Sequence, residues 1–319
     1  MKEAETEQNT VPQANELRTT LKHYDLNLLP VFDAVMQEQN ITRASKVLKM
    51  SQPAVSNAVA RLKKLFDDEL FMRQGRGIMP TQRARELFGP IRQCLQIIRN
   101  ELPDFKFIPK TTERTFSLSI GSPLDLRLSS SLMSRIKEEA PCSRVTVESC
   151  VDRMIFDRLK LQEIDFSIDY TKFELSEYSS HELFEDELVV IASKEHTRIS
   201  EVVTKKQLEH EEHARISGIE GDVEFARAAY SEISVNVGYR AQNVLSLLKV
   251  VEETELVAIV PMWLLEMTNK LKDFQVLDCP LKNNTAKCYL TWHKASEKDK
   301  GHVWLRDQIM EIANDVHNS

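Results

Sequence analysis

The segment MSQPAVSNAVARLKKLF, residues 50–66, restricts the fold of this chain more than any other stretch. Ser51 is a residue type that commonly begins helices, and Pro53 follows in the first turn, where its missing N–H removes no hydrogen bond. The apolar residues behind it recur at the spacing of one helix face. The segment therefore predicts a helix that begins at Ser51, buries one side and keeps a polar leading end.

Two further helices are predicted just before this one. An apolar stripe runs through residues 25–39, and a second short helix occupies residues 42–48. Lys49, Met50 and Ser51 form the tight turn into the third helix. Two short helices joined by a tight turn, the second with a polar leading end, form a helix-turn-helix, which presents that end to base edges in the major groove of DNA.

The run from Leu70 to Gln82 predicts a β-wing, because two apolar stretches flank a turn at residues 74–77. Arg73 and Arg76 lie near the tip of this wing, where arginines suit phosphate or minor-groove contact. The wing completes a head at residues 23–80. The candidate DNA contacts of the head are Thr42, Arg43, Ser51, Gln52, Pro53, Ser56, Asn57, Arg61, Lys63, Arg73 and Arg76.

Charge separates this head from the rest of the chain. The net charge of −7 by itself argues against a nucleic-acid binder. Residues 23–100, however, contain 12 Lys and Arg against 7 Asp and Glu, whereas residues 101–319 contain 27 against 38. A basic head on an acidic body indicates a polyanionic partner at the head alone. For Lys63 and Lys64, a phosphate contact and a solvated helix face remain equally open.

A long linker helix is predicted for residues 81–102, because apolar side chains recur there at spacings of three and four. Pro90 interrupts the pattern and is expected to bend the helix. A second copy of the helix is the expected partner of this stripe, and packing on the chain's own body is the alternative. A polar, proline-bearing hinge follows at residues 103–113. The candidate dimerisation residues are Leu87, Ile91, Leu95 and Ile98.

From residue 114 onward, strand patterns alternate with helix patterns, which is typical of an α/β domain with parallel sheets. One of the predicted strands is DELVVIAS, residues 186–193. Because about 200 residues is generous for one sheet, we expect two lobes with a cleft between them, and ligands near strand carboxyl ends. Lobe I is expected at about residues 114–190 and 279–319, and lobe II at about residues 191–278.

The stretch DLNLLPVFDAVMQEQNITRASKVLKMSQPAVSNAVARLKKLFDDELFMRQGRGIMPT resembles, element for element, the winged helix-turn-helix of the LysR-type transcriptional regulators. The resemblance omits only residues 1–22, a polar and aperiodic stretch that is predicted to be a disordered arm. It implies an α/β fold class with an N-terminal winged helix-turn-helix, a long linker helix and a C-terminal two-lobed, periplasmic-binding-protein-like effector domain.

The same resemblance implies what the protein binds. Members of the family look like homotetramers, built as dimers of dimers, that bind interrupted, AT-rich inverted repeats in double-stranded DNA. RNA polymerase is a further expected partner. Many members carry arginine at the position that matches Asn57, beside the serine that matches Ser56. Asparagine favours adenine and arginine favours guanine, so the family's usual base preference is not expected at this point.

The resemblance also places a small-molecule effector between the two lobes, near Ser122, Pro123, Asp169 and Tyr170. A helix is predicted to begin at Pro123, and its N-terminus offers free N–H groups to an anion. Ser122 either contacts such an effector or simply caps this helix. Because no clear set of effector-binding residues is visible, two functions stay open for the body: a regulatory sensor, and a ligand-independent scaffold that only assembles the tetramer and organises DNA.

Catalytic and metal-binding motifs are absent from the sequence, so we expect no enzyme activity, no cofactor and no metal. HEEH at residues 210–213 spaces its histidines by three, whereas the metalloprotease motif spaces them by four, and a solvated acidic face is the expected alternative. Neither G-x-S-x-G nor a phosphate-binding loop occurs. Five cysteines without a C-x-x-C pair, a polar N-terminus and no long apolar run predict a cytoplasmic, nucleoid-associated protein without membrane contact.

Overall fold

The computed structural model describes residues 24–74, 77–102, 106–148, 154–218, 221–222 and 224–317. The expected arm at residues 1–22 and the wing-tip residue Arg76 lie outside the described residues. The chain divides into two compact units, one ending at Leu95 and the other beginning at Gln96. Within the described residues, every helix is too short or too polar to cross a bilayer.

The helical part of the first unit follows the sequence closely. The Asn40 side chain accepts the Arg43 N–H at 3.0 Å, and the Ser51 hydroxyl accepts the Ala54 N–H at 3.3 Å. These bonds satisfy N–H groups that have no partner within the first turn of a helix. The predicted helix start at Ser51 is therefore confirmed. The three helices are α2 (Leu28–Glu38), α3 (Ile41–Val47) and α4 (Gln52–Phe66).

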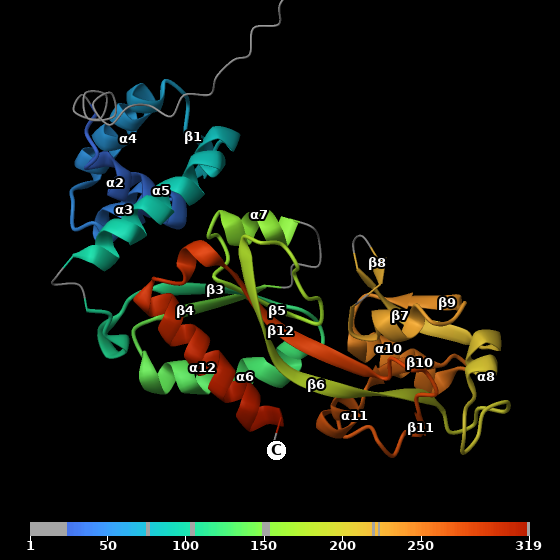
Figure 1. Ribbon diagram of the computed structural model, residues 1–319. Helices are drawn as coiled ribbons and strands as arrows, with labels where there is room; N and C mark the ends of the chain where they lie inside the picture. The colour runs from blue at the N-terminus through green and yellow to red at the C-terminus, as the bar shows by residue number, and fades with distance from the viewer. Residues whose placement is uncertain are drawn as a thin grey trace, which may run out of the picture. The chain divides into compact units, whose positions relative to one another are not determined.

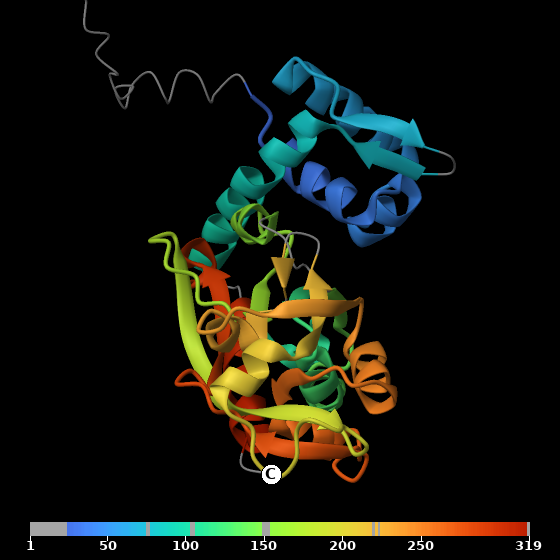
Figure 2. The same cartoon turned by 90° about the vertical axis from the view of Figure 1, so that its right-hand side faces the viewer.

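Two short strands complete the head as a wing. β1 (Phe71–Gln74) and β2 (Gly77–Pro80) pair antiparallel, as the view in Figure 2 shows. The hydroxyl of Thr81 then accepts the Ala84 N–H at 3.3 Å and begins the long helix α5 (Gln82–Glu101). The helix continues through Pro90.

The core of the head is centred on Phe32, which is fully buried. Its ring centroid lies 6.4 Å from that of Phe66 and 5.9 Å from that of Phe71, so the wing and α4 close on α2. Ala84 and Ile91 of α5 belong to the same core and are 0 % and 8 % exposed. The first half of the linker helix is therefore part of the head.

The second unit contains a seven-stranded sheet (Figure 1). β3 (Thr115–Ile120) pairs parallel with β4 (Arg144–Glu148) and β5 (Phe166–Asp169), as predicted. β12 (Thr285–His293) is antiparallel to β5 and to β6 (Tyr178–Ser193). The expectation of wholly parallel sheets is therefore wrong here, because β6 and β12 run past each other in opposite directions.

The remaining elements complete two lobes around these strands. The sheet order is β10-β6-β12-β5-β3-β4, with β11 also paired to β6, and a second sheet has the order β8-β7-β9. The elements not yet bounded are α6 (Leu124–Glu139), α7 (Met154–Lys160), α8 (Lys205–His210), β7 (Glu212–Gly218), β8 (Gly221–Asp222), α9 (Arg227–Tyr230), β9 (Asn236–Ala241), α10 (Val244–Glu253), β10 (Ala258–Pro261), α11 (Met262–Met267), β11 (Phe274–Asp278) and α12 (Lys300–His317).

Strand β6 contributes to the hydrophobic cores of both lobes. Its residue Phe184 lies in the lobe I core, which packs β3, α6 and α12 together. Its residue Leu188 lies in the lobe II core, which packs β7, α10 and α11 together. β12 also contributes to both cores, with Ala286 in the lobe II core and Cys288 in the lobe I core. The two long strands are therefore the structural connection between the lobes.

A buried charged network supports lobe I beneath α12. Arg114 donates to Asp165 at 2.8 Å and to Asp299 at 2.6 Å. His302 is fully buried, stacks on Phe166 with ring centroids 3.9 Å apart, and donates from Nε2 to the Asp165 carbonyl at 3.0 Å. Burial lowers the pKa of His302 to about 4, and the Arg114 charge acts in the same direction. The ring is therefore neutral in the folded protein near neutral pH.

We expect the second unit to lose stability as the pH falls from about 6.5 to about 4. In this range the unfolded chain, with a histidine pKa near 6.5, binds a proton at residue 302, whereas the folded protein keeps His302 neutral. This one proton lowers the free energy of unfolding by up to about 1.4 kcal/mol for each pH unit in that range. Urea unfolding at a series of pH values should show a shallower loss for His302→Gln than for the parent. His181→Gln, at an exposed position on β6, is the control. Equal slopes in the parent and the His302 variant would contradict this account.

Candidate nucleic-acid interface and effector site

The leading end of α4 carries a continuous polar surface. Gln52, Pro53, Ser56 and Asn57 are all exposed, as is the capping residue Ser51. The opposite side of the helix buries Val55, Ala58 and Leu62, which are 0 %, 6 % and 0 % exposed. The local spacing of apolar residues thus orients the helix, and the cap directs its first N–H groups outward. This is the geometry that an α-helix needs to enter a major groove by its N-terminal end.

Three of the predicted DNA-contacting cations have carboxylate partners within the head. Arg43 Nε lies 3.2 Å from Glu38, and Arg61 lies 2.5 Å from Asp25. Lys63 pairs with Glu69. All three cations remain exposed, so these are surface ion pairs of small energy that a phosphate can displace.

The Asp25 carboxylate shows how local bonds prepare such a pair. Hydrogen bonds from Asn27, first from its backbone N–H, lower the pKa of Asp25, and the charge of Arg61 lowers it further. Asp25 therefore stays ionised and ties the segment before α2 to Arg61 of α4. The linked residues are 36 positions apart, and the helical periodicity alone does not indicate the pairing.

Other exposed cations of the head are free of such partners in the part of the chain that the structure describes. Arg73 on the wing and Lys64 on α4 are two of them. Lys46 and Lys49, at the end of α3 and in the turn after it, are two more, which the sequence interpretation missed. The sequence pattern could have indicated them as phosphate contacts, because both lysines lie within the helix-turn-helix and outside its apolar stripe. Thr42, the remaining predicted contact, is also exposed on α3.

The four predicted effector residues lie at one edge of the lobe I sheet. β3 and β5 are parallel neighbours, so Ser122 and Pro123 after β3 approach Asp169 and Tyr170 at the end of β5. At Gly121 an added Cβ would lie 2.1 Å from an Asp169 carboxylate oxygen, so a larger residue there would displace the Asp169 side chain.

Ser122 does not occupy the N-cap position of helix α6. The helix α6 begins at Leu124, its N-cap is Pro123, and no side chain caps it. The interpretation in which Ser122 simply caps this helix is therefore wrong. Its side chain is half-buried beside the helix N-terminus.

Two of the other predicted effector residues already have intramolecular partners. Asp169 accepts hydrogen bonds from the N–H and the hydroxyl of Thr171, at 3.1 and 3.2 Å. The Tyr170 hydroxyl donates to Asp186 at 2.7 Å. Burial raises the pKa of Tyr170 well above its ordinary value, and the Asp186 charge raises it further, so Tyr170 remains a neutral donor. The sequence interpretation missed Asp186, although the alternation along β6 places it between the inward-facing Phe184 and Leu188.

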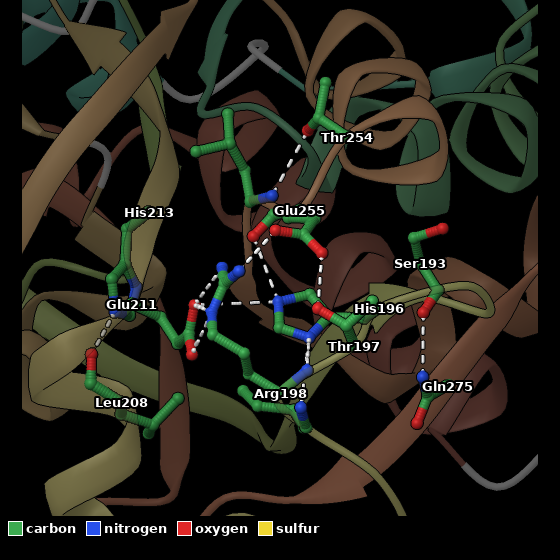
Figure 3. A network of polar contacts seen from close by, with 12 residues as sticks. Ser193, His196, Thr197, Arg198, Leu208, Glu211, His213, Thr254, Glu255 and Gln275 are labelled. Atoms are coloured by element: carbon green, nitrogen blue, oxygen red, sulfur yellow. Dashed lines mark hydrogen bonds and ion pairs between the residues drawn. The ribbon is translucent and has the colours of Figure 1, made fainter.

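The HEEH segment forms structural contacts within lobe II, as Figure 3 shows. His213 is fully buried, and its Nε2 donates to the Leu208 carbonyl at 2.8 Å. Glu211, 5 % exposed, binds the Arg198 guanidinium at 2.7 Å. The interpretation of these two residues as a solvated acidic face is therefore wrong, because α8 and β7 turn them inward. Among the described residues, no group of three or more His, Cys, Asp and Glu is arranged to hold a metal ion.

Arg198 connects this segment to a second loop. It also pairs with Glu255, whose carboxylate accepts the Thr197 hydroxyl at 2.6 Å (Figure 3). These hydrogen bonds, the one from Thr197 first, lower the pKa of Glu255 to about 2. His196 adds a bond from Nε2 to the Glu255 carbonyl at 3.0 Å. The network joins three loops of lobe II.

Two family models match the chain, and together they cover both units. "Bacterial regulatory helix-turn-helix protein, lysR family" matches residues 26–85, which hold the head and its capped helices. "LysR substrate binding domain" matches residues 110–313, which hold the two lobes.

Individual relatives agree with these models. The chain is 46 % identical to the HTH-type transcriptional regulator LeuO of Escherichia coli (strain K12), over 94 % of this chain and 96 % of that one. It is 29 % identical to Nodulation protein D 3 of Rhizobium leguminosarum bv. phaseoli, over 92 % and 98 %.

Solved structures show the same architecture. A probable transcriptional regulator from Pseudomonas aeruginosa has a TM-score of 0.65 and 27 % identity, and covers 91 % of this chain and 98 % of that one. A full-length OxyR from Pseudomonas aeruginosa, with a TM-score of 0.71 and 16 % identity over 90 % and 95 % of the two chains, shares the fold. The chain therefore belongs to the LysR family of transcriptional regulators, with a DNA-binding helix-turn-helix head and a two-lobed effector-binding domain.

Proposed function

We propose that this regulator reads AT-rich, interrupted inverted repeats as a dimer of dimers, and that its effector-binding domain modulates the outcome. The observation that supports sequence-specific reading is the exposed leading end of α4, which lies opposite a fully buried face. Gln52, Ser56 and Asn57 supply amide and hydroxyl groups there, which are the groups that read base edges. The protein acts on nucleoid DNA in the cytoplasm, together with RNA polymerase, and performs no catalysis.

Asn57 sets a base preference in this proposal. An asparagine amide can donate to N7 and accept from N6 of adenine at once, which no other base pair matches in the major groove. Asn57 is exposed beside Ser56 on α4, which supports a contact between its amide and the groove. An adenine within each half-site is the expected contact, consistent with an AT-rich operator.

We expect Asn57→Ala to lose discrimination at one base position, by about 1–3 kcal/mol, and to keep its affinity for unrelated DNA. Binding measured against operators substituted one position at a time would show this. Arg73→Ala is the matched control, because a phosphate contact on the wing should weaken all sequences alike and reduce the salt dependence by about one charge. If Asn57→Ala weakened every sequence equally, α4 would not enter the groove in the orientation described.

The linker helix supports dimer formation, through a smaller set of residues than its apolar stripe indicates. Ile91 lies in the core of its own head, so it offers no surface to a second copy. Leu87 and Leu95 are only partly buried against that core, and Ile98 is 53 % exposed. We place the seam between two copies at Leu87, Leu95 and Ile98, where burial against a second helix would remove apolar surface from water.

We expect Ile98→Glu to convert dimers into monomers and to abolish the advantage of a paired operator over a single half-site, because a charge would enter an apolar seam. Sedimentation and binding to one or two half-sites would measure both effects. Ile98→Leu is the conservative control. Ile91→Glu should instead lower the melting temperature of the head, because it places a charge in a closed core. An unchanged oligomer in Ile98→Glu would rule out this seam.

A ligand-independent scaffold is the second candidate for the body. It is favoured by the internal hydrogen bonds of Asp169 and Tyr170, because groups that already have partners within the protein are less available to a ligand. Among the predicted effector contacts in the described residues, Ser122 has a hydroxyl without such a bond. A small effector near Ser122 and Pro123 remains the first candidate, because the N-terminus of α6 lies beside them. Thermal unfolding in the presence of small organic anions distinguishes the two, since only a sensor is stabilised by its ligand.

A further inference from the structure

Asp186 lies at the point where the two lobes meet. It is on β6, between Phe184 of the lobe I core and Leu188 of the lobe II core. The residue is 4 % exposed, so its carboxylate is almost completely removed from water. A buried carboxylate is stable only when charged or polar donors replace the water it has lost.

Three donors contact the Asp186 carboxylate in place of water, and they come from different parts of the domain. Tyr170, which packs against both cores, donates from its hydroxyl to Oδ2 at 2.7 Å. Trp263 on α11 of lobe II donates from Nε1 to the same oxygen at 3.0 Å. Arg127 on α6 of lobe I pairs with Oδ1. One carboxylate thus holds lobe I, lobe II and the connecting strand together.

The arginine adds a second contact across the lobe boundary. The Arg127 guanidinium lies 4.5 Å from the ring centroid of Phe184 and 5.1 Å from that of Trp263. Its side chain is only 10 % exposed. Guanidinium groups stack on aromatic faces, and such contacts strengthen when water is excluded. Any displacement of α11 relative to α6 would therefore disturb both the ion pair and the stacking.

We propose that Asp186 is an internal carboxylate ligand that latches the two lobes, so that its release loosens lobe I and lobe II together. The carboxylate occupies a site with three convergent donors, which would accept a small organic carboxylate if Asp186 were absent. An anionic effector that used Arg127 would have to displace Asp186 first. The consequence for DNA binding rests on the modulatory role proposed above for the effector-binding domain.

The first experiment tests the site by chemical rescue with sodium formate. In the full-length protein, Asp186→Ala should lower the melting temperature of the effector-binding domain by about 5 °C or more, because Arg127 is left buried without its partner. Formate should restore part of this loss with a saturable dose dependence, whereas sodium chloride at equal ionic strength should not. Glu187→Ala, at the neighbouring exposed position, is the control and should show neither loss nor rescue. A loss that formate does not reverse more than chloride would overturn the proposal.

A second experiment keeps the proposal testable if Asp186→Ala does not fold. Asp186→Asn preserves the side-chain volume and removes the charge, and Trp263→Phe preserves the ring and removes the lobe II donor. Hydrogen exchange of the full-length variants should become faster in α6 of lobe I and in α11 of lobe II together. Faster exchange in one lobe alone, or unchanged exchange in both, would show that Asp186 does not couple the lobes.

A footprint of the same variants on operator DNA separates this inference from the proposed function. A changed footprint length supports both the latch and modulation by the domain. Faster exchange in both lobes with an unchanged footprint supports the latch and removes the modulatory role. A changed footprint with unchanged exchange supports modulation and overturns the latch.

Discussion

The antiparallel pairing of β6 with β12 is the constraint on which the two-lobed domain depends. β6 runs for 16 residues, and its first half pairs with β12 while its second half pairs with β10 and β11. A strand this long cannot bury all its residues in one small core, so it contributes to two. Both lobes are consequently built on the same pair of strands, and any change in their relative position must bend those strands or break the side-chain contacts beside them.

Two buried charged clusters in the described part of this domain draw their partners from more than one element. Arg114 joins Asp165 and Asp299, and Arg127 joins Asp186. Replacing water with fixed donors at such sites demands accurate geometry, so these clusters define positions more sharply than apolar contacts do. The Arg114 cluster lies within lobe I, where it has a structural role. The Asp186 cluster lies on the lobe boundary, where the same chemistry couples the lobes.

The head distributes its charge differently. Its cations are on the surface, where Arg43, Arg61 and Lys63 hold carboxylates that neutralise part of the basic surface. Such pairs reduce the long-range attraction to DNA and are weak enough to exchange for phosphate. The polar leading end of α4 needs no such release, because its exposed amides and hydroxyls carry no charge. In the function proposed above, base reading and electrostatic attraction are therefore assigned to different residues of the same small domain.

The sequence by itself determined the features that depend on neighbours along the chain. Ser51 and Pro53 specify the start of α4 through bonds within one turn, and the apolar spacing specifies which side is buried. Local patterns also predicted the strands that became β3 and β5, whereas the position of Ser122 opposite Asp169 was implied by the family resemblance. These features predicted the helix-turn-helix and the α/β class.

The tertiary structure alone decided the features that depend on distant residues. The strand predicted at residues 186–193 already begins at Tyr178, because β12, about a hundred residues later, pairs with its polar first half. His213 is buried because α8 and β7 turn it inward, and Ile91 is covered by its own head. Asp186 reads in sequence as one charge among several, and only folding brings Arg127 and Trp263, 59 and 77 positions away, to its carboxylate. Periodicity reports which side of an element is buried, but the partner that buries it is chosen by the packing of the whole chain.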